Sequence, residues 1–324
     1  MTISSDVSAP LVVVVGATGV QGGSVIRNLI ESDKPYRLRG LTRDASQPAA
    51  QKIKDLGVEV VTVNIVVGNE AEVRDAFKGG DIIFSMTKFK EHLDTEREVA
   101  EGKLMVDAAK AVGAKLFIFS GLPPVSKLSG GKYTRVARFD GKAEVAEYAR
   151  SQLPAVDVQA GYYMTNLQST LNFTSPKKQD DGTYLWHILG DSGSTLPYID
   201  MDADYGLFVR FAIESPEYSK GGGTIYSYGE RVTTPQAAAS LEKLRGITIK
   251  LVTVSPDEHR ANLEKSELPH IVKNILGDLT YMAEYGYYFG LELGEEQQRV
   301  RSQLARKPRT FEEFLRANPD FLAA

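Results

Sequence analysis

Short apolar runs alternate with amphipathic segments through the first half of the chain. The runs are rich in β-branched residues and apolar almost throughout, which favours strands that are buried on both faces. Strands that alternate with helices are typical of βαβ units and a parallel sheet. The pattern predicts strands at Leu11–Val15, Arg37–Thr42, Val58–Val63, Asp81–Met86, Leu116–Ser120 and Val156–Ala160.

Helical patterns fill the gaps between these runs. The clearest is Thr95–Val112, which places Val99, Val106 and Val112 on one face and is followed by Gly113 as a stop. The other helices predicted here are Gly23–Ser32, a helix capped by Asn69 that ends near Phe77, and Gly141–Ser151.

The second half of the chain is less regular. Asp202 can cap a helix that contains Leu207 and Phe208, and Thr234 with Pro235 is typical of an N-cap and first helical position. Pro123–Thr134, rich in Gly, Ser and Pro, is a candidate mobile loop. Further predicted elements are strands at Thr224–Tyr228 and Ile247–Val254, and helices at Thr234–Arg245, Leu268–Tyr281 and Glu295–Ala305.

Composition narrows the function classes. The net charge is −4 and no dense Lys/Arg block exists, so we expect no direct nucleic-acid binding and no membrane attachment. No cysteine is present, which excludes thiol catalysis and fits an intracellular protein, and the four histidines are too scattered to suggest a metal site. We expect a cytoplasmic location, with the nucleus also open.

A glycine turn follows the first predicted strand. Gly16 allows a tight turn, Gly19 lets the backbone approach a pyrophosphate, and Gly22 lets helix and strand pack closely. The helix that follows presents free N–H groups to the phosphates. The turn therefore predicts a dinucleotide site rather than a plain βα turn, with contacts from Gly16, Thr18, Gly19, Val20, Gln21 and Gly22.

The end of the second predicted strand bears on the choice between NAD and NADP. An acidic residue is expected there for NAD, but Thr42 and Arg43 occupy the position. Arginine binds phosphate bidentately and stays charged, so we predict NADP(H). Asp44 argues against this preference unless its side chain turns to solvent and only begins the next loop.

Four segments taken together are more specific than the glycine turn alone: Val12–Gly22, Leu41–Asp44, Phe139–Val145 and Tyr285–Tyr288. With them the chain resembles, from about Leu11 to Leu315, the NmrA-like family of atypical short-chain dehydrogenase/reductases. The resemblance implies an α/β fold, with a Rossmann-type doubly wound parallel sheet in the order 3-2-1-4-5-6, with or without a seventh strand. It also implies a smaller, discontinuous C-terminal α/β domain. We predict a dinucleotide domain at 1–161 with return segments at about 200–228, interleaved with a substrate or partner domain at 162–324.

The same resemblance bears on catalysis. Ordinary short-chain dehydrogenases use a tyrosine four residues before a lysine, and here Arg138 precedes Lys142. Arginine cannot deprotonate, so it cannot replace that tyrosine as acid or base. Lys142 is then a ribose ligand, an acid or base with Ser120 and Tyr162 nearby, or a surface lysine; ribose binding is the favoured interpretation.

Other cofactor neighbours are expected at the carboxyl ends of the strands, as the family resemblance implies. Asn64 and Lys88 depart from the family pattern at this edge. The tyrosines after the sixth strand are as well explained by core packing as by ring stacking. The remaining expected neighbours are Ser85, Met86, Thr87, Ser120, Gly121, Gly161, Tyr162, Tyr163 and Asn166.

Two roles follow from the resemblance, because the family contains dinucleotide-responsive regulators, one of which binds a transcription factor, as well as reductases. An intact glycine turn beside a missing tyrosine favours an NADP(H)-binding regulator that acts through a protein partner such as a transcription factor. The alternative is an NADPH-dependent reductase of a small carbonyl or alkene that uses Lys142. Aromatic residues at Tyr281–Phe289 suit core packing better than a substrate pocket.

Overall fold

The predicted strands of the first half form one parallel sheet. We describe the computed structural model over residues 3–134, 136–168, 175–265, 267–269 and 279–323. Seven parallel strands lie in the order β11-β6-β5-β4-β1-β2-β3, which confirms the Rossmann-type prediction in its seven-stranded form. Their bounds are β1 Leu11–Val15, β2 Arg37–Thr42, β3 Glu59–Thr62, β4 Ile82–Ser85, β5 Leu116–Phe119, β6 Ala155–Ala160 and β11 Thr224–Ser227.

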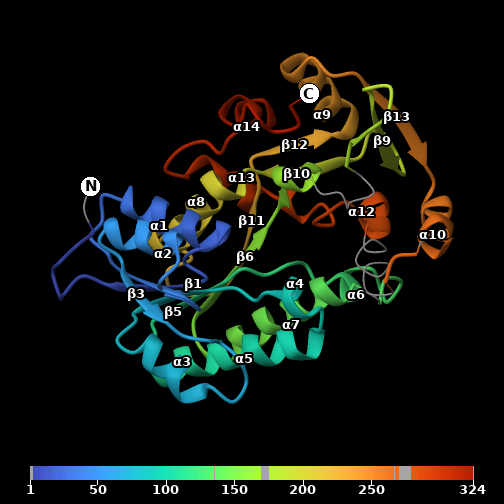
Figure 1. Ribbon diagram of the computed structural model, residues 1–324. Helices are drawn as coiled ribbons and strands as arrows, with labels where there is room; N and C mark the ends of the chain where they lie inside the picture. The colour runs from blue at the N-terminus through green and yellow to red at the C-terminus, as the bar shows by residue number, and fades with distance from the viewer. Residues whose placement is uncertain (1–2, 135, 169–174, 266, 270–278, 324) are drawn as a thin grey trace.

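Helices cover both faces of this sheet, so its strands are buried from two sides (Figure 1). One apolar core lies under α1 (Val20–Ile30) and α8 (Met201–Glu214), which pack closely against each other. The other lies under α3 (Glu70–Phe77), α5 (Thr95–Ala111) and α7 (Ala137–Gln152). This double cover explains why the strands are apolar almost throughout.

The C-terminal half builds a third apolar core around two small sheets. One has the order β12-β10-β7 and the other β13-β9-β8. The aromatic residues of the C-terminal segment lie in this core, among them Tyr281 and Tyr288, as packing considerations predicted. The strands are β7 Tyr162–Tyr163, β8 Lys177–Lys178, β9 Tyr184–Leu189, β10 Thr195–Ile199, β12 Glu230–Thr233 and β13 Ile249–Val254. The longer helices are α9 Thr234–Arg245, α10 Pro256–Lys265, α12 Leu279–Tyr285, α13 Glu295–Ser302 and α14 Phe311–Ala317.

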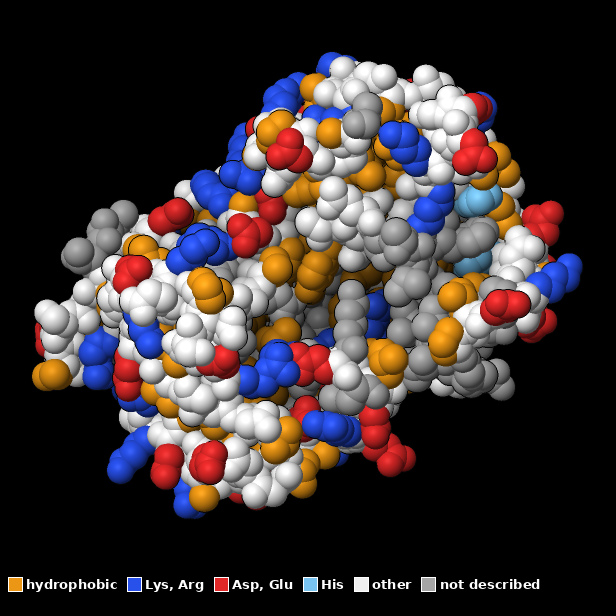
Figure 2. Space-filling model, viewed as in Figure 1, with side chains coloured by type: hydrophobic (Ala, Val, Ile, Leu, Met, Phe, Trp, Pro, Cys, Tyr) orange, Lys and Arg blue, Asp and Glu red, His pale blue; other side chains and the backbone are white. Residues whose placement is uncertain are grey.

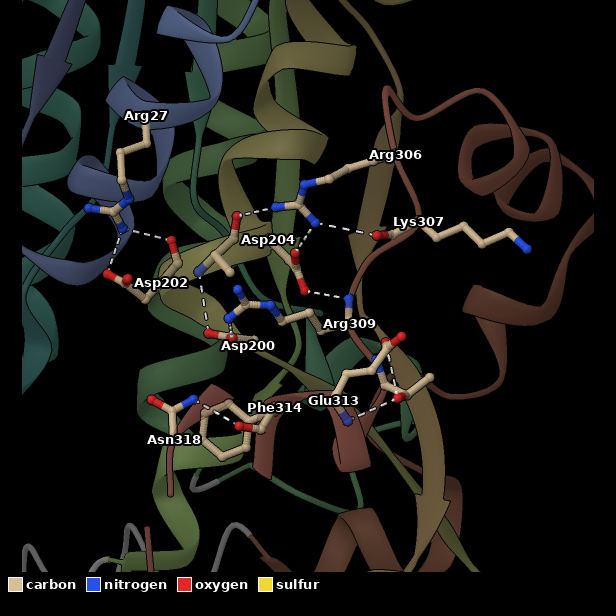
Figure 3. Close-up of polar contacts among 12 residues, drawn as sticks. Arg27, Asp200, Asp202, Asp204, Arg306, Lys307, Arg309, Glu313, Phe314 and Asn318 are labelled. Atoms are coloured by element: carbon tan, nitrogen blue, oxygen red, sulfur yellow. Dashed lines mark hydrogen bonds and ion pairs between the residues drawn. The ribbon is translucent and has the colours of Figure 1, made fainter. Parts of the chain in front are cut away.

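The segment around 200–228 returns to the Rossmann sheet, where β11 pairs with β6. Figure 3 shows how charged groups fasten the start of α8 to the chain before α14. The fully buried Asp204 accepts from Arg306 at 2.6 Å and from the backbone N–H of Arg309 at 2.7 Å. Arg309 also pairs with Asp200 at 2.8 Å. These contacts join the two halves of the molecule.

Four predicted helix starts were wrong. The α7 helix, predicted from Gly141, begins at Ala137. The α8 helix is capped by Asp200, whose side chain accepts from the N–H of Ala203, and Asp202 lies inside its first turn. Thr233, not Thr234, caps α9, because it forms a reciprocal capping box with Gln236. The α1 helix starts directly after Gly19 rather than at Gly23.

Other differences concern elements with weak sequence patterns. Asn69 precedes α3, but its side chain donates to Asn64 and Glu72 instead of capping. The predicted loop at 123–134 contains a helical turn, α6 (Val125–Leu128). Most of the helix predicted at 268–281 lies outside the described residues. The prediction omitted α10 and the short strands of the C-terminal half. Among the helices described, none is long and apolar enough to cross a membrane.

Candidate functional site

The glycine turn between β1 and α1 is shaped as the sequence predicted. Gly16 has φ +66°, a left-handed value that suits glycine. A Cβ at Gly22 would lie 2.3 Å from the carbonyl oxygen of Gly16, so no side chain fits there. Gly19 is the N-cap of α1 and supplies no side-chain cap. The first N–H groups of α1 are therefore left to an external acceptor.

A cavity of about 1090 Å³ opens beside this turn, at the carboxyl ends of the strands. Several predicted residues line it, as do the two that depart from the family pattern, Asn64 and Lys88. The predicted residues in its wall are Gly16, Thr18, Thr42, Arg43, Met86 and Thr87. Its place at the edge of a doubly wound sheet is where ligands of such folds bind.

Charged side chains gather at one corner of the cavity. Arg43 pairs with Glu91 at 2.8 Å, and Lys88 lies 3.4 Å from the other oxygen of the same carboxylate. Arg43 stays 58% exposed on its side chain, so it is accessible to a ligand. The Asp44 carboxylate instead accepts from Ser46 and Gln47 of its own loop, and these bonds lower its pKa to about 2. Both residues line the cavity, but the Asp44 carboxylate is held by its own loop, whereas the Arg43 side chain stays largely exposed beside Glu91.

Lys142 lies beyond Thr87, in a buried ion pair that the sequence analysis missed. Its ammonium is 2.9 Å from Glu98, and the two side chains are 13% and 0% exposed. It also donates to the backbone oxygen of Thr87 at 3.1 Å and to its hydroxyl at 2.6 Å. That hydroxyl in turn donates to Glu98 at 2.6 Å. Three acceptors thus match the three protons of the ammonium.

Burial lowers the pKa of Lys142, Glu98 opposes that shift, and the charge of Arg138 adds to it. The second oxygen of Glu98 is buried without a hydrogen-bond partner. A sequence signal for this acid existed, because Glu98 shares the buried face of α5 with Gly102 and Met105. A carboxylate among buried positions of a helix indicates a charge that needs a buried partner.

Ser85, Ser120 and Gly121 lie deeper than expected. Ser85 is fully buried and its hydroxyl is directed at the sulfur of Met105. Ser120 is buried beside the Tyr205 hydroxyl. A Cβ on Gly121 would lie 2.0 Å from the Asp157 carboxylate, which explains the glycine. None of the three lines the cavity.

The residues after β6 divide into two groups. Tyr162 belongs to β7 and packs edge-on against Tyr198, with ring centres 5.4 Å apart, so it is a core residue. Gly161 is hemmed in by backbone oxygens, with the nearest 2.5 Å from a built Cβ. Tyr163 differs, because its hydroxyl accepts from Gln21 of α1 at 2.8 Å. Asn166 lies in the helical turn that follows, and its carbonyl accepts from Ser175.

A second buried acid, Asp157, lies on β6 beside this group. Burial raises its pKa from 3.8 to about 6, although Arg150 lies 3.9 Å away and Gln159 donates at 2.8 Å. The folded state therefore holds this proton more tightly than the unfolded chain. The stabilising contribution is complete below about pH 4 and is lost as the pH rises through 6.

We expect Asp157→Asn to remove this pH dependence, because the amide keeps the shape of the carboxylate without its charge. The shift from 3.8 to about 6 corresponds to about 3 kcal/mol. Relative to the parent protein, the variant should gain about this much stability between pH 4 and pH 7. Urea unfolding followed by circular dichroism at several pH values measures the difference, and a pH-independent difference would contradict the assignment.

The sequence comparisons are consistent with this site and fold. The NmrA-like family profile matches residues 8–315. An NmrA-like family domain-containing protein of Dictyostelium discoideum is 28% identical over 316 residues, which cover 94% of this chain and 96% of that protein. The NmrA-like family domain-containing oxidoreductase cpsB of Aspergillus campestris is 30% identical over 273 residues, covering 78% of this chain and 77% of that protein.

Among solved structures, the negative transcriptional regulator NmrA in complex with NAD has a TM-score of 0.78 at 23% identity, covering 96% of this chain and 95% of that one. The same protein in complex with NADP gives a TM-score of 0.77 at 23% identity, with the same coverage. This likeness extends the fold assignment over both halves of the molecule.

Proposed function

This chain belongs to the NmrA-like family, and from that premise we propose that it binds NADP(H) and acts as a dinucleotide-responsive regulator. The observation that carries the proposal is the conjunction of an uncapped glycine turn with an accessible arginine in one cavity wall. The fold neighbour NmrA, a negative transcriptional regulator, has been solved with both NAD and NADP.

The residues of the glycine turn and the cavity wall fit a bound NADP(H) molecule. The N–H groups at the start of α1 would take the pyrophosphate, since Gly19 carries no side chain and Gly22 lets α1 pack closely against the turn. Arg43 would take the 2′-phosphate, for which Glu91 is the present counter-ion. A buried, unpartnered oxygen on Gln21 marks the other end of the turn as a place for a polar ligand atom. When bound, the nicotinamide supplies a hydride donor or acceptor.

The hydrogen bonds of Lys142 favour a protein that binds the dinucleotide and responds to it over an enzyme that uses this lysine to transfer a proton. All three ammonium protons have protein acceptors, so none is left for a substrate oxygen. No tyrosine stands four residues earlier, because that position is Arg138. The same saturation argues against Lys142 as a ribose ligand in this conformation and assigns it to the packing of α5 against α7.

Residues 123–134 connect α7 to the C-terminal half and could carry a conformational response to cofactor binding. Ser126 donates its N–H to Asp140 of α7 at 3.0 Å. Lys132 and Tyr133 reach Glu284 of α12 at 2.6 and 2.7 Å. The segment thus touches both the helix that carries Lys142 and the C-terminal half. We propose that cofactor binding shifts this segment, and with it the surface offered to a protein partner such as a transcription factor, in the cytoplasm or nucleus.

The test is calorimetric titration with NADP⁺, NADPH, NAD⁺ and NADH. We expect Arg43→Ala to weaken the binding of NADP(H) about 10- to 100-fold, because charge-assisted hydrogen bonds to the 2′-phosphate are lost. The affinity for NAD(H) should stay nearly unchanged. Lys52→Ala is the matched control, because Lys52 is an exposed cation on the next helix, α2 (Pro48–Asp55), and does not line the cavity.

Two outcomes of that titration would count against the proposal. Equal binding of all four dinucleotides would remove the NADP preference. A regulator that responds to redox state also requires different affinities for NADPH and NADP⁺, since a ligand shifts a conformational equilibrium only by differential affinity. Identical values for the two would leave a binding protein without redox response.

A reductase is the second candidate, favoured by one observation in the site and one in the comparisons. Burial lowers the pKa of Lys142, a property of lysines that exchange protons. Several relatives are named oxidoreductases. If the protein is a reductase, the contact between Lys142 and Glu98 has to break before Lys142 can donate a proton to a small carbonyl or alkene substrate.

A further inference from the structure

Glu91 joins two segments that lie on either side of the glycine turn. In the sheet, β1 lies between β2 and β4, and the glycine turn continues from the carboxyl end of β1. Arg43 directly follows β2, whereas Glu91 belongs to α4 (Phe89–His92), the short helix that follows β4. Their contact at 2.8 Å therefore connects the two flanking strand ends across the end of β1, in the wall of one cavity.

The carboxylate of Glu91 is held by two cations at once. Arg43 binds one oxygen, and Lys88 lies 3.4 Å from the other. A guanidinium and an ammonium that share one anion make a site that also suits a phosphate, whose oxygens accept several charge-assisted hydrogen bonds. In this structure a carboxylate of the protein itself occupies that site.

The other two acids of the cavity wall have partners close to them in the sequence. Asp44 accepts from its own loop, and Glu101 pairs at 2.8 Å with Arg97, one turn earlier in α5. Both carboxylates can keep these contacts when a ligand enters. Glu91 differs, because it loses a partner as soon as a phosphate binds Arg43.

The charges of the cavity wall cancel. They come from three cations and three acids: Arg43, Lys88, Arg97, Asp44, Glu91 and Glu101. The whole chain carries a net charge of −4, and Figure 2 shows Lys and Arg side chains interspersed with Asp and Glu side chains over the face that it draws. The affinity of a phosphate for this wall therefore depends on which anion Arg43 and Lys88 hold.

The contact between Arg43 and Glu91 is one that a ligand can replace. Their side chains are 58% and 44% exposed, and water screens such a pair, which typically changes an equilibrium by no more than about fivefold. Phe89 is buried and anchors the start of α4, whereas Leu93, which ends the helix, has φ +56°, an unfavourable value for leucine. The helix is thus fixed at one end and strained at the other, which permits Glu91 to turn away.

We propose that Glu91 is a built-in competitor for the 2′-phosphate of NADP(H). Its carboxylate occupies the site formed by Arg43 and Lys88 in the free protein, and the phosphate displaces it on binding. The inference rests on the proposed function, since it concerns the same dinucleotide site. NAD(H) carries a hydroxyl in place of that phosphate and leaves the contacts of Glu91 intact. Glu91 therefore sets how strongly the site prefers NADP(H) over NAD(H).

The test is calorimetric titration of Glu91→Gln with NADP⁺ and NAD⁺. Glutamine keeps the length of the side chain but not its charge, so NADP⁺ should bind about three- to tenfold more tightly than to the parent protein, and NAD⁺ affinity should change less than about twofold. High salt should reduce the gain, because exposed charges are screened. Glu96→Gln is the matched control, since it removes the same charge from an exposed acid of α5 that does not line the cavity, and it should change neither affinity.

A double-mutant cycle with Arg43→Ala separates competition from general repulsion of anions. If Glu91 competes for Arg43, Glu91→Gln should improve NADP⁺ binding less than about twofold once the arginine is absent. The same gain with and without Arg43, no gain in the parent background, or an equal gain for NAD⁺ would overturn the assignment of Glu91.

The failure of this inference can be told apart from the failure of the proposed function. A parent protein that binds no dinucleotide would defeat the proposed function. The nucleotide 2′-AMP carries the phosphate without the pyrophosphate or the nicotinamide, and it should still bind Glu91→Gln more tightly than the parent protein. Equal binding of 2′-AMP to the two proteins, or binding to neither, would count against Glu91 as a competitor, while NADP⁺ binding to the parent protein would leave the proposed function standing.

Discussion

Lys142→Met is expected to lower the free energy of unfolding by about 3–5 kcal/mol, because it leaves Glu98 as an uncompensated buried charge. Glu98→Gln should be destabilising for the converse reason. The double variant Lys142→Met/Glu98→Gln should recover much of the loss, since no buried charge remains. Urea unfolding of the four proteins in a double-mutant cycle gives the coupling energy directly.

The chain offers a matched control between the same two helices. Lys103 of α5 and Glu144 of α7 are 2.6 Å apart, but their side chains are 37% and 55% exposed. Lys103→Met should therefore cost no more than about 1 kcal/mol. If Lys142→Met were as mild as this control, the buried pair would not hold α5 to α7. Full NADPH turnover by a folded Lys142→Met protein would, in addition, rule out Lys142 as the acid of a reductase.

Gly22→Ala is expected to reduce NADP⁺ affinity by at least about 100-fold, or about 3 kcal/mol. The added Cβ would lie 2.3 Å from the Gly16 oxygen and 2.9 Å from Ala17, both backbone atoms that cannot rotate away. The turn has to open, which moves the N–H groups of α1 that we assign to the pyrophosphate. Calorimetry with NADP⁺ measures the loss, and circular dichroism confirms that the variant is folded.

Gly23→Ala is the control for this substitution. Gly23 is the next residue of the same helix, and its Cβ would lie 3.2 Å from the flexible end of Arg27 and 3.8 Å from the Ala17 oxygen, an ordinary van der Waals distance. Alanine also favours a helix over glycine, so this variant should bind NADP⁺ like the parent protein and be at least as stable. A Gly22→Ala protein that binds as well as Gly23→Ala would refute the assignment of the turn.

The helix starts show that local sequence can place a helix without identifying the residue that caps it. Asp200 and Asp202 are equally good capping residues, and so are Thr233 and Thr234, so propensity cannot choose between them. The choice at α9 depends on Gln236, which completes a capping box with Thr233. At α8 it depends on Asp200, which also binds Arg309 from the far end of the chain.

Some of the candidate site residues could likewise be placed from local sequence, and others could not. The positions of Gly16 and Arg43 beside one cavity, and the close packing at Gly22, could be predicted, because the strand, the glycine spacing and the missing acid are local features of the sequence. Tyr162 was expected near the cofactor but lies in the apolar core of the C-terminal half, because β7 pairs with β10. No local pattern at Tyr162 records that pairing.

By itself, the sequence determined the Rossmann sheet, the phosphate-binding turn, and the replacement of the expected tyrosine by Arg138, since each is a property of neighbouring residues. Only the tertiary structure decided that Glu98 and Thr87 satisfy Lys142, that Glu91 pairs with Arg43, and that the Nε atom of Arg138 is buried without a hydrogen bond. These are contacts between different elements, and burial sets their strength. A charge at the protein surface is screened by water, but the same charge in the interior requires a partner that only the folded chain brings within reach.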